Sequence, residues 1–302
     1  MNDVFAAPSL EEAALAPPEL RSQAGEVATG IGYYVYGVLR AVEPGDARLY
    51  TWEQPQDQAV ELVTAGGLAA VVSQVSLAEF GDGVLAGNLR DLDWVEGRVR
   101  GHHRVLIALL AGDLTPVPMR FCTLFQSEDR VRQMLVDHNS LLCSALERLE
   151  GRAEWGVKMF CDSTAVRRRV EQRAEGTRTF DGTTGAGGPG TAYFLRKKLE
   201  KMLDAEVERV TDEAAQASHE ALARLAADAV VLALQDQEVT RRAERMLLNG
   251  AYLLDRHRLL EFERELDRLT LDYGPLGCSF ELTGPWPAYN FVKAVAAEAS
   301  GG

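Results

Sequence analysis

Apolar and polar positions along the first half of this chain follow two different periods. Short apolar runs at 33–39 and 68–75 predict two strands of one sheet. Residues 92–111 repeat apolar positions at helical spacing, and so does a segment that starts at an N-cap at Ser127 and ends near Gly151. A strand over 117–125 is expected between these helices. The pattern predicts an N-terminal α+β domain spanning 31–151.

The second half has its own order of elements. Merging its two consecutive helical segments into one crossover predicts β-α-β-β-α-β, the ferredoxin-like order, for a C-terminal domain spanning 152–292. The fold class is therefore α+β with two domains. The expected elements are a strand at 154–161, a helix from 163, a flexible Gly-rich insert at 181–190, a long helix at 193–227, strands at 229–234 and 246–254, a helix at 259–273 and a strand at 278–282.

The two ends of the sequence carry weaker patterns. Residues 1–30 are rich in Ala, Pro and Glu, a composition that predicts a disordered or weakly ordered tail. A short C-terminal tail is expected at 293–302.

The long helix at 193–227 is unusual, because few compact domains need a helix of about 50 Å, at 1.5 Å per residue. We favour a helix that covers its own sheet while its first turns overhang. The alternative is an arm that pairs with another chain, which would make the protein a coiled-coil adaptor.

Charge narrows the classes of partner. The net charge is −13 and the sequence pI is near 5.0, so nucleic acid and anionic membranes are repelled at long range. No apolar run approaches the roughly 20 residues that span a bilayer. The first 30 residues lack a basic segment followed by an apolar one, so we expect the protein to stay in the cytoplasm.

Residue types that could carry catalysis occur without a catalytic pattern. The four cysteines are widely separated and favour reduced, mostly buried thiols over disulfides or a zinc site. His102 and His103 are adjacent on a helix and point about 100° apart, so they cannot share a metal; His102 is expected to be a hydrogen-bonded core residue. The sequence predicts no catalytic residues, no metal and no cofactor.

The most informative segment is residues 282–292, Leu-Thr-Gly-Pro-Trp-Pro-Ala-Tyr-Asn-Phe-Val, which we call the hook. Pro285 and Pro287 cannot donate strand hydrogen bonds, so the preceding strand is expected to stop at the start of the hook. Three aromatic residues then follow on a rigid backbone.

The hook resembles the C-terminal signature of the gas vesicle protein GvpL/GvpF family, and three further segments resemble the family in order and spacing. They are Tyr-Tyr-Val-Tyr-Gly-Val at 33–38, Pro-Val-Pro-Met-Arg-Phe at 116–121 and Glu-Trp-Gly-Val-Lys at 154–158. The sequence departs from the family pattern at Cys122, where glycine is common, and at Ala288, where a second proline is common. The first departure suggests that the backbone after Phe121 does not need glycine's freedom, and the second leaves the hook slightly less rigid.

The resemblance implies a non-enzymatic role in gas vesicle formation. The protein would be a minor structural component of the shell or an assembly factor that binds the major, hydrophobic shell protein, with other gas vesicle accessory proteins as further partners. An enzyme with a small-molecule site between the domains and the coiled-coil adaptor are the alternatives.

Eight residues from the segments that carry the resemblance are candidates for partner binding or for the domain junction. Within this set, Arg120 is expected to form an internal salt bridge, Trp155 to anchor the junction and Lys158 to point outward from its strand. The candidates are Arg120, Phe121, Trp155, Lys158, Trp286, Tyr289, Asn290 and Phe291.

Overall fold

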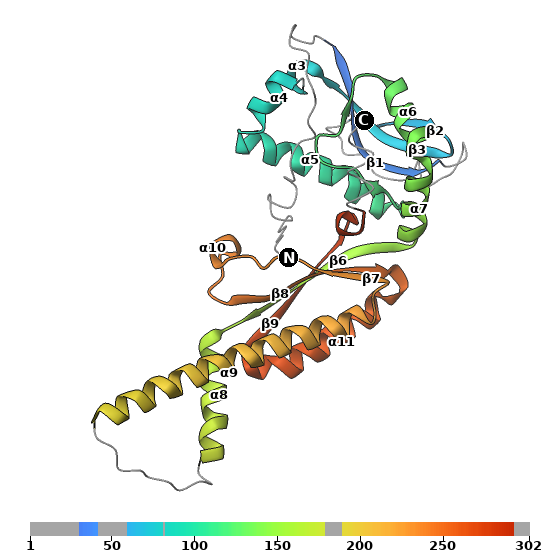
Figure 1. The fold of residues 1–302 in the computed structure, drawn as a ribbon. Coiled ribbons are helices and arrows are strands. Elements are labelled where there is room, and N and C mark those ends of the chain that lie inside the picture. Colours follow the sequence, from blue (N-terminus) through green and yellow to red (C-terminus); the bar gives the residue numbers. More distant parts are fainter. Residues whose placement is uncertain (1–29, 42–58, 81, 179–188, 293–302) are drawn as a thin grey trace. The chain divides into compact units, whose positions relative to one another are not determined.

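A computed structural model describes residues 30–41, 59–80, 82–178 and 189–292. The expected tails at 1–30 and 293–302 and most of the Gly-rich insert lie outside these ranges. The chain forms two compact units, each built of helices around an antiparallel sheet (Figure 1). Unit 1 comprises Met1–Ala153 and Pro285–Gly302, and unit 2 is Glu154–Gly284. The contact boundaries thus differ from the expected 152–292 at its end, because the last part of the hook packs in unit 1.

The sheet of unit 1 is organised around β1 (Ile31–Arg40). One edge of β1 pairs with β3 (Leu68–Ser76), from Ile31 opposite Ser76 to Arg40 opposite Leu68, with a register shift between Val35 and Gly37. The edge strand β2 (Glu61–Ala65) pairs with β3, and β4 (Val117–Pro118) and β5 (Leu124–Phe125) pair with the other side of β1.

The main helix of unit 1 is α5 (Leu92–Ala111), whose first turn is capped by the Asp91 carboxylate at 3.1 Å from the Asp93 amide. Its apolar face packs Val105, Leu106 and Leu109 onto Tyr34, Tyr36 and Leu39 of β1. The remaining helices are α3 (Leu77–Phe80), α4 (Asp82–Asn88), α6 (Glu128–Asp137) and α7 (Asn139–Leu149). Ser127 caps α6 as predicted, but the expected single helix is interrupted at His138.

The strand expected over 117–125 is wrong, because only its ends pair with β1. Pro118 has no amide to donate, and Cys122 has a φ of 63°, in the left-handed region that extended strands exclude. Between them the Thr123 amide donates to the Arg120 carbonyl at 3.2 Å and closes a turn. The interpretation that this backbone does not need glycine's freedom is therefore also wrong: Cys122 adopts a conformation that glycine adopts at lower cost.

Unit 2 has one four-stranded sheet in the order β7-β8-β6-β9. Its apolar face buries Val157, Tyr252 and Leu254 against Phe262 and Leu266 of α11 (Leu259–Tyr273), a helix that begins and ends as predicted. The other elements are β6 (Arg152–Cys161), α8 (Ser163–Arg178), α9 (Pro189–Ala223), β7 (Asp228–Val231), α10 (Gln237–Thr240), β8 (Arg245–Asp255), β9 (Cys278–Trp286) and 3-10 turns at Arg256–Arg258, Gly274–Leu276 and Tyr289–Phe291.

The long helix α9 has 35 residues and starts at Pro189, within the expected insert. Its first half extends past the sheet, and α9 crosses α8 near its middle (Figure 1). Leu203, Val207 and Val210 pack there with Val166 and Val170 of α8. These contacts hold the middle of α9 against the first half of α8.

Cys161 and Cys278 form a disulfide, so the prediction of reduced thiols is wrong for this pair. The two residues face each other on the neighbouring strands β6 and β9, with a Cα–Cα distance of 4.1 Å. Their separation of 117 residues in sequence hides this proximity. Cys122 and Cys143 are free.

The strand β9 does not stop at the start of the hook, as predicted, but runs through Pro285 to Trp286. An edge strand tolerates proline, because one row of its amides has no strand partner, and β9 is at the edge of its sheet. Gly284 makes this possible with a φ of 131°, and a Cβ at this position would crowd the Glu154 carbonyl and the Trp155 ring.

Replacing Gly284 by alanine is expected to destabilise the protein by about 2 kcal/mol, because the new Cβ would lie in a disfavoured φ region. That Cβ would also come within 3.0 Å of the Glu154 carbonyl oxygen. Denaturant unfolding measures the loss. Gly97→Ala is the matched control: it lies in α5 with nothing within 4 Å of its new Cβ, and it should stabilise by up to about 1 kcal/mol. Equal effects of the two changes would contradict the role assigned to Gly284.

Candidate functional site

The last part of the hook docks in unit 1 through buried anchors. Ala288, Phe291 and Val292 are buried, with exposed fractions of 6%, 6% and 2%. Trp286 and Tyr289 are half-buried. The hook is therefore fixed by its small and C-terminal side chains, and two of its large aromatic rings reach the surface only in part.

Two consecutive histidines of α5 receive the hook. The Trp286 ring lies 5.2 Å from the His103 ring, and the Tyr289 ring is stacked on His102 with centroids 6.5 Å apart. Both imidazoles meet the hook although their side chains leave the helix in different directions, because the hook itself curves through a 3-10 turn at Tyr289–Phe291.

His102 also belongs to a buried polar chain. Its Nδ1 atom lies 2.8 Å from the Tyr34 hydroxyl, which accepts a hydrogen bond from the Cys122 amide at 3.2 Å. The hydroxyl can then donate its own proton to Nδ1. The prediction that His102 is a hydrogen-bonded core residue is confirmed.

Burial keeps the titratable groups beneath the hook uncharged. It lowers the pKa of His102 to about 3 and that of His103 to about 4. It raises the pKa of the Cys122 thiol to about 12, and it raises the pKa of Tyr34 well above its ordinary value. A neutral imidazole, a protonated thiol and a phenol support packing at neutral pH, and none of them is poised near pH 7 for acid–base catalysis.

Stability should fall on acidification because of these histidines. The pKa of each histidine in the folded state is below its unfolded value near 6.5, so the unfolded state binds more protons. The free energy of unfolding therefore decreases as the pH falls from about 6.5 toward 4. The slope should approach about 1.4 kcal/mol per pH unit for each histidine. Urea midpoints measured across this range test it. His102→Gln should reduce the slope; a variant with the slope of the wild type would contradict the assignment.

Outside the hook region, two features would favour an enzyme: a metal-ligand cluster and a groove that could bind a substrate. Among the described residues, no group of three or more His, Cys, Asp or Glu side chains could hold a metal ion. An open groove of about 390 Å³ lies in unit 2 between α9 and α11, and its acidic side chains are paired, Glu261 with Arg258 at 3.0 Å and Glu265 with Arg268 at 2.7 Å. The residues that line it are Ala221, Arg224, Leu225, Glu261, Arg264, Glu265 and Arg268.

Comparison with known proteins identifies the family. The sequence model described as gas vesicle synthesis protein GvpL/GvpF matches residues 32–293, which is most of the chain. The chain belongs to the GvpL/GvpF family. Gas vesicle protein L of a Streptomyces species is 32% identical over 264 residues, covering 86% of this chain and 92% of that protein. Gas vesicle protein L1 of Halobacterium salinarum is 26% identical, covering 92% of this chain and 97% of that protein.

Solved GvpF structures share the fold. The crystal structure of GvpF from an Anabaena species aligns with a TM-score of 0.60 at 17% identity, covering 87% of this chain and 96% of that one. GvpF from Microcystis aeruginosa aligns with a TM-score of 0.56 at 16% identity, covering 86% and 98%. At these identities the likeness concerns the fold alone. Within the described ranges, no helix is both long and apolar enough to cross a membrane.

Of the segments that resemble the GvpL/GvpF family, residues 116–121 and the last part of the hook lie in unit 1, whereas residues 154–158 lie in unit 2. Phe121, Trp286, Tyr289 and Phe291 all lie in unit 1, and the Phe121 ring meets His102 edge-on at 6.2 Å. Asn290 is half-buried beside them. Phe121 and Tyr289 thus meet His102, and Trp286 meets His103, two histidines that the list of candidates did not contain.

The predictions for Arg120, Trp155 and Lys158 have different outcomes. The structure describes no ion pair of Arg120 among residues 30–41, 59–80, 82–178 and 189–292, and the expected internal salt bridge stays a prediction. Trp155 lies in unit 2, where its ring packs on Gly284 and on the core of that unit. Lys158 is half-buried on β6 and donates to the Gln235 side chain at 3.1 Å.

Sequence reasoning missed Tyr34 and Cys122 as parts of the polar chain. Tyr34 belongs to an apolar strand, and no rule of spacing connects it with residues 68 and 88 positions away. One sequence feature pointed to Cys122: the GvpL/GvpF pattern favours glycine at this position, which indicates an unusual backbone conformation.

Proposed function

We propose that this member of the GvpL/GvpF family is a non-catalytic, protein-binding component of gas vesicle formation that captures the major shell protein. It would act as a minor structural component of the shell or as an assembly factor, together with other gas vesicle accessory proteins. Membership of the GvpL/GvpF family supports a role in gas vesicle formation. The observation that carries the binding role is the anchored hook, with Trp286 and Tyr289 half-buried and their neighbours Ala288 and Phe291 buried.

The hook has the properties of a pre-organised binding element. Pro285 and Pro287 restrict its backbone, and Phe291 and Val292 fix its end in the core of unit 1. The rings of Trp286 and Tyr289 are therefore held in place before any partner arrives, which lowers the entropy lost on binding. Tryptophan and tyrosine are also among the residues that contribute most to binding energy at protein interfaces.

A catalytic role has less support. The titratable groups beneath the hook are buried and neutral, and the groove of unit 2 contains paired charges and no His, Cys or Ser. The Tyr34 hydroxyl and the His102 imidazole that meet beneath the hook are both held neutral by burial, and the groove lining contains no nucleophile beside a base. An apolar shell protein, by contrast, exposes surface that aggregates before it polymerises, and an acidic protein with aromatic contacts can shield it.

We also propose that unit 2 is a ferredoxin-like domain. Two supports are its element order, with α8 and α9 as one crossover, and its strand order β7-β8-β6-β9. In this proposal the functional protein is located at the gas vesicle.

A capture experiment with localisation tests the proposed function. The full-length chain is immobilised and incubated with purified shell protein, and vesicles purified from the producing cells are labelled with an antibody against the chain. Capture with labelled vesicles supports a structural component, and capture with unlabelled vesicles supports an assembly factor. Absence of capture, with normal vesicles in cells that lack the gene, would overturn the proposal.

A further inference from the structure

The solvent face of α9 carries a stripe of five exposed residues that is positively charged at one end and negatively charged at the other. Its members are spaced by three, four, three and four residues, which places them on one side of the helix. The order is two lysines, an alanine and two carboxylates. The stripe consists of Lys198, Lys201, Ala205, Glu208 and Asp212.

The stripe points away from the rest of unit 2. The opposite side of α9 packs Leu203, Val207 and Val210 against α8 and the sheet. Met202 flanks the stripe near its centre and is 60% exposed, which is unusual for a large apolar side chain on an otherwise charged surface. Among the described residues, this face of the helix carries both basic and acidic side chains, and all five members of the stripe are exposed.

Most of the stripe's charges have no partner within the chain. In the part of the chain that the structure describes, Lys198, Lys201 and Asp212 form no hydrogen bond or ion pair by their side chains. Glu208 contacts Arg245 at 2.8 Å, and both of these side chains stay about half exposed, at 55% and 49%. Such an exposed contact exchanges readily with another cation.

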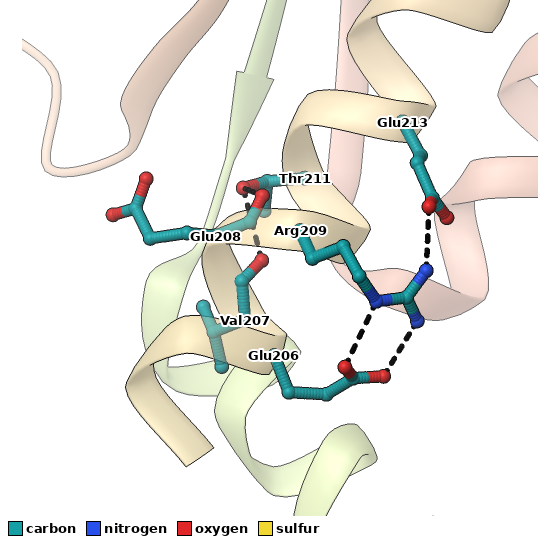
Figure 2. Close-up of polar contacts among 6 residues, drawn as sticks. All are labelled: Glu206, Val207, Glu208, Arg209, Thr211 and Glu213. Carbon is teal, nitrogen blue, oxygen red and sulfur yellow. Dashed lines mark hydrogen bonds and ion pairs between the residues drawn. The ribbon is translucent and has the colours of Figure 1, made fainter. Parts of the chain in front are cut away.

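The one basic residue among the acidic positions of α9 is neutralised locally. Arg209 donates to both oxygens of Glu206, at 2.9 and 2.6 Å, and to Glu213 at 2.5 Å (Figure 2). Figure 2 also shows that Glu208 points to the other side of the helix from this cluster. The arginine charge is therefore already matched, and the acidic half of the stripe keeps its sign.

We infer that α9 pairs antiparallel with α9 of a second copy of this chain, with the two-fold axis at Ala205. About that axis Lys198 of each copy lies opposite Asp212 of the other, and Lys201 lies within one residue, about 1.5 Å along the helix axis, of Glu208 of the other. Each contact forms twice because the interface is isologous. The small side chain of Ala205 lets the helices approach at the axis, Met202 is covered beside it, and antiparallel helix dipoles favour the arrangement. This inference is independent of the proposed function.

Other classes of partner fit the stripe less well. A nucleic acid or an anionic membrane would attract the lysines, but it would repel Glu208 and Asp212 on the same face and a chain whose net charge is −13. A helix whose charges are complementary to itself in reverse order matches both halves at once.

Sedimentation velocity on the full-length chain tests the pairing, at roughly 20 mM and roughly 500 mM salt, because salt screens exposed charges. We expect a dimer at low salt that dissociates at high salt. K198E/K201E and E208K/D212K should each weaken the dimer about tenfold or more, since like charges then face each other. An equimolar mixture of the two variants should form a heterodimer that is tighter than either variant alone.

The matched control is R168E/R169E, which makes the same charge change on exposed residues of α8 outside the stripe. It should leave the dimer unchanged. A chain that is monomeric at both salt concentrations, a loss of equal size in the α8 control or a mixture without a heterodimer would each overturn the inference.

Cysteine cross-linking tests the antiparallel order. Ala205→Cys should form a disulfide with its own copy at the axis, which mass spectrometry can distinguish from bonds of Cys122 or Cys143. Gln216→Cys should not, because its two copies would lie about 33 Å apart at 1.5 Å per residue. Cross-linking at both positions would indicate parallel helices and would overturn the inference.

Discussion

Reduction of the disulfide between Cys161 and Cys278 is expected to lower the free energy of unfolding by about 3 to 5 kcal/mol. The bond closes a loop with a sequence separation of 117 residues, and a long cross-linked loop restricts the unfolded chain strongly. Denaturant unfolding with and without reductant measures the difference. Cys161→Ala should produce a loss of similar size and should make the protein insensitive to reductant.

The two free cysteines provide the controls for this prediction. Cys122→Ala and Cys143→Ala should each keep the difference between reduced and oxidised protein, because neither side chain takes part in the bond. Thiol titration of the unfolded, unreduced chain should find the two free thiols. Four reactive thiols, together with equal stability in the presence and absence of reductant, would contradict the prediction.

Phe291→Ala is expected to destabilise the protein by about 3 to 4 kcal/mol, whereas Trp286→Ala should cost less than about 2 kcal/mol. Phe291 is only 6% exposed, and its loss leaves a cavity at the end of the hook. Trp286 packs one side on His103 and is half-buried, so its loss opens a surface depression and not a cavity. Urea unfolding of both variants checks the difference. If the two changes cost the same, the division of the hook into anchors and surface aromatics is wrong.

Much of the fold could be predicted from the sequence where a local signal decides the structure. The apolar period of residues 259–273 defines α11, and Ser127 before acidic residues marks the start of α6. The hook also stands out in the sequence, because prolines and aromatics coincide there, and its role in binding stays a prediction. These features depend on neighbours a few residues away.

The errors concern contacts between residues distant in sequence. Nothing local shows that Cys161 and Cys278 face each other, because their proximity follows from the pairing of β6 with β9. The end of β9 was misplaced for a related reason: the cost of Pro285 in a strand depends on whether the strand is at an edge. Cys122 shows a third limit, since no propensity rule assigns a left-handed conformation to cysteine.

The candidate site was predicted in its surface residues and missed in its interior. Trp286 and Tyr289 stand out by residue type, but the histidines that receive them lie in α5, more than 180 positions earlier in the sequence. His102 was predicted as a core residue without a link to the hook. Only the tertiary structure joins these segments, because the chain returns to unit 1 after completing unit 2.

Two measurements on Trp286→Ala decide whether the hook binds the shell protein: its melting curve and its capture of purified shell protein. We expect the variant to melt within a few degrees of the wild type and to capture the shell protein about tenfold or more weakly, since a half-buried tryptophan at an interface contributes to binding more than to folding. A stable variant that captures the shell protein as well as the wild type would contradict the claim.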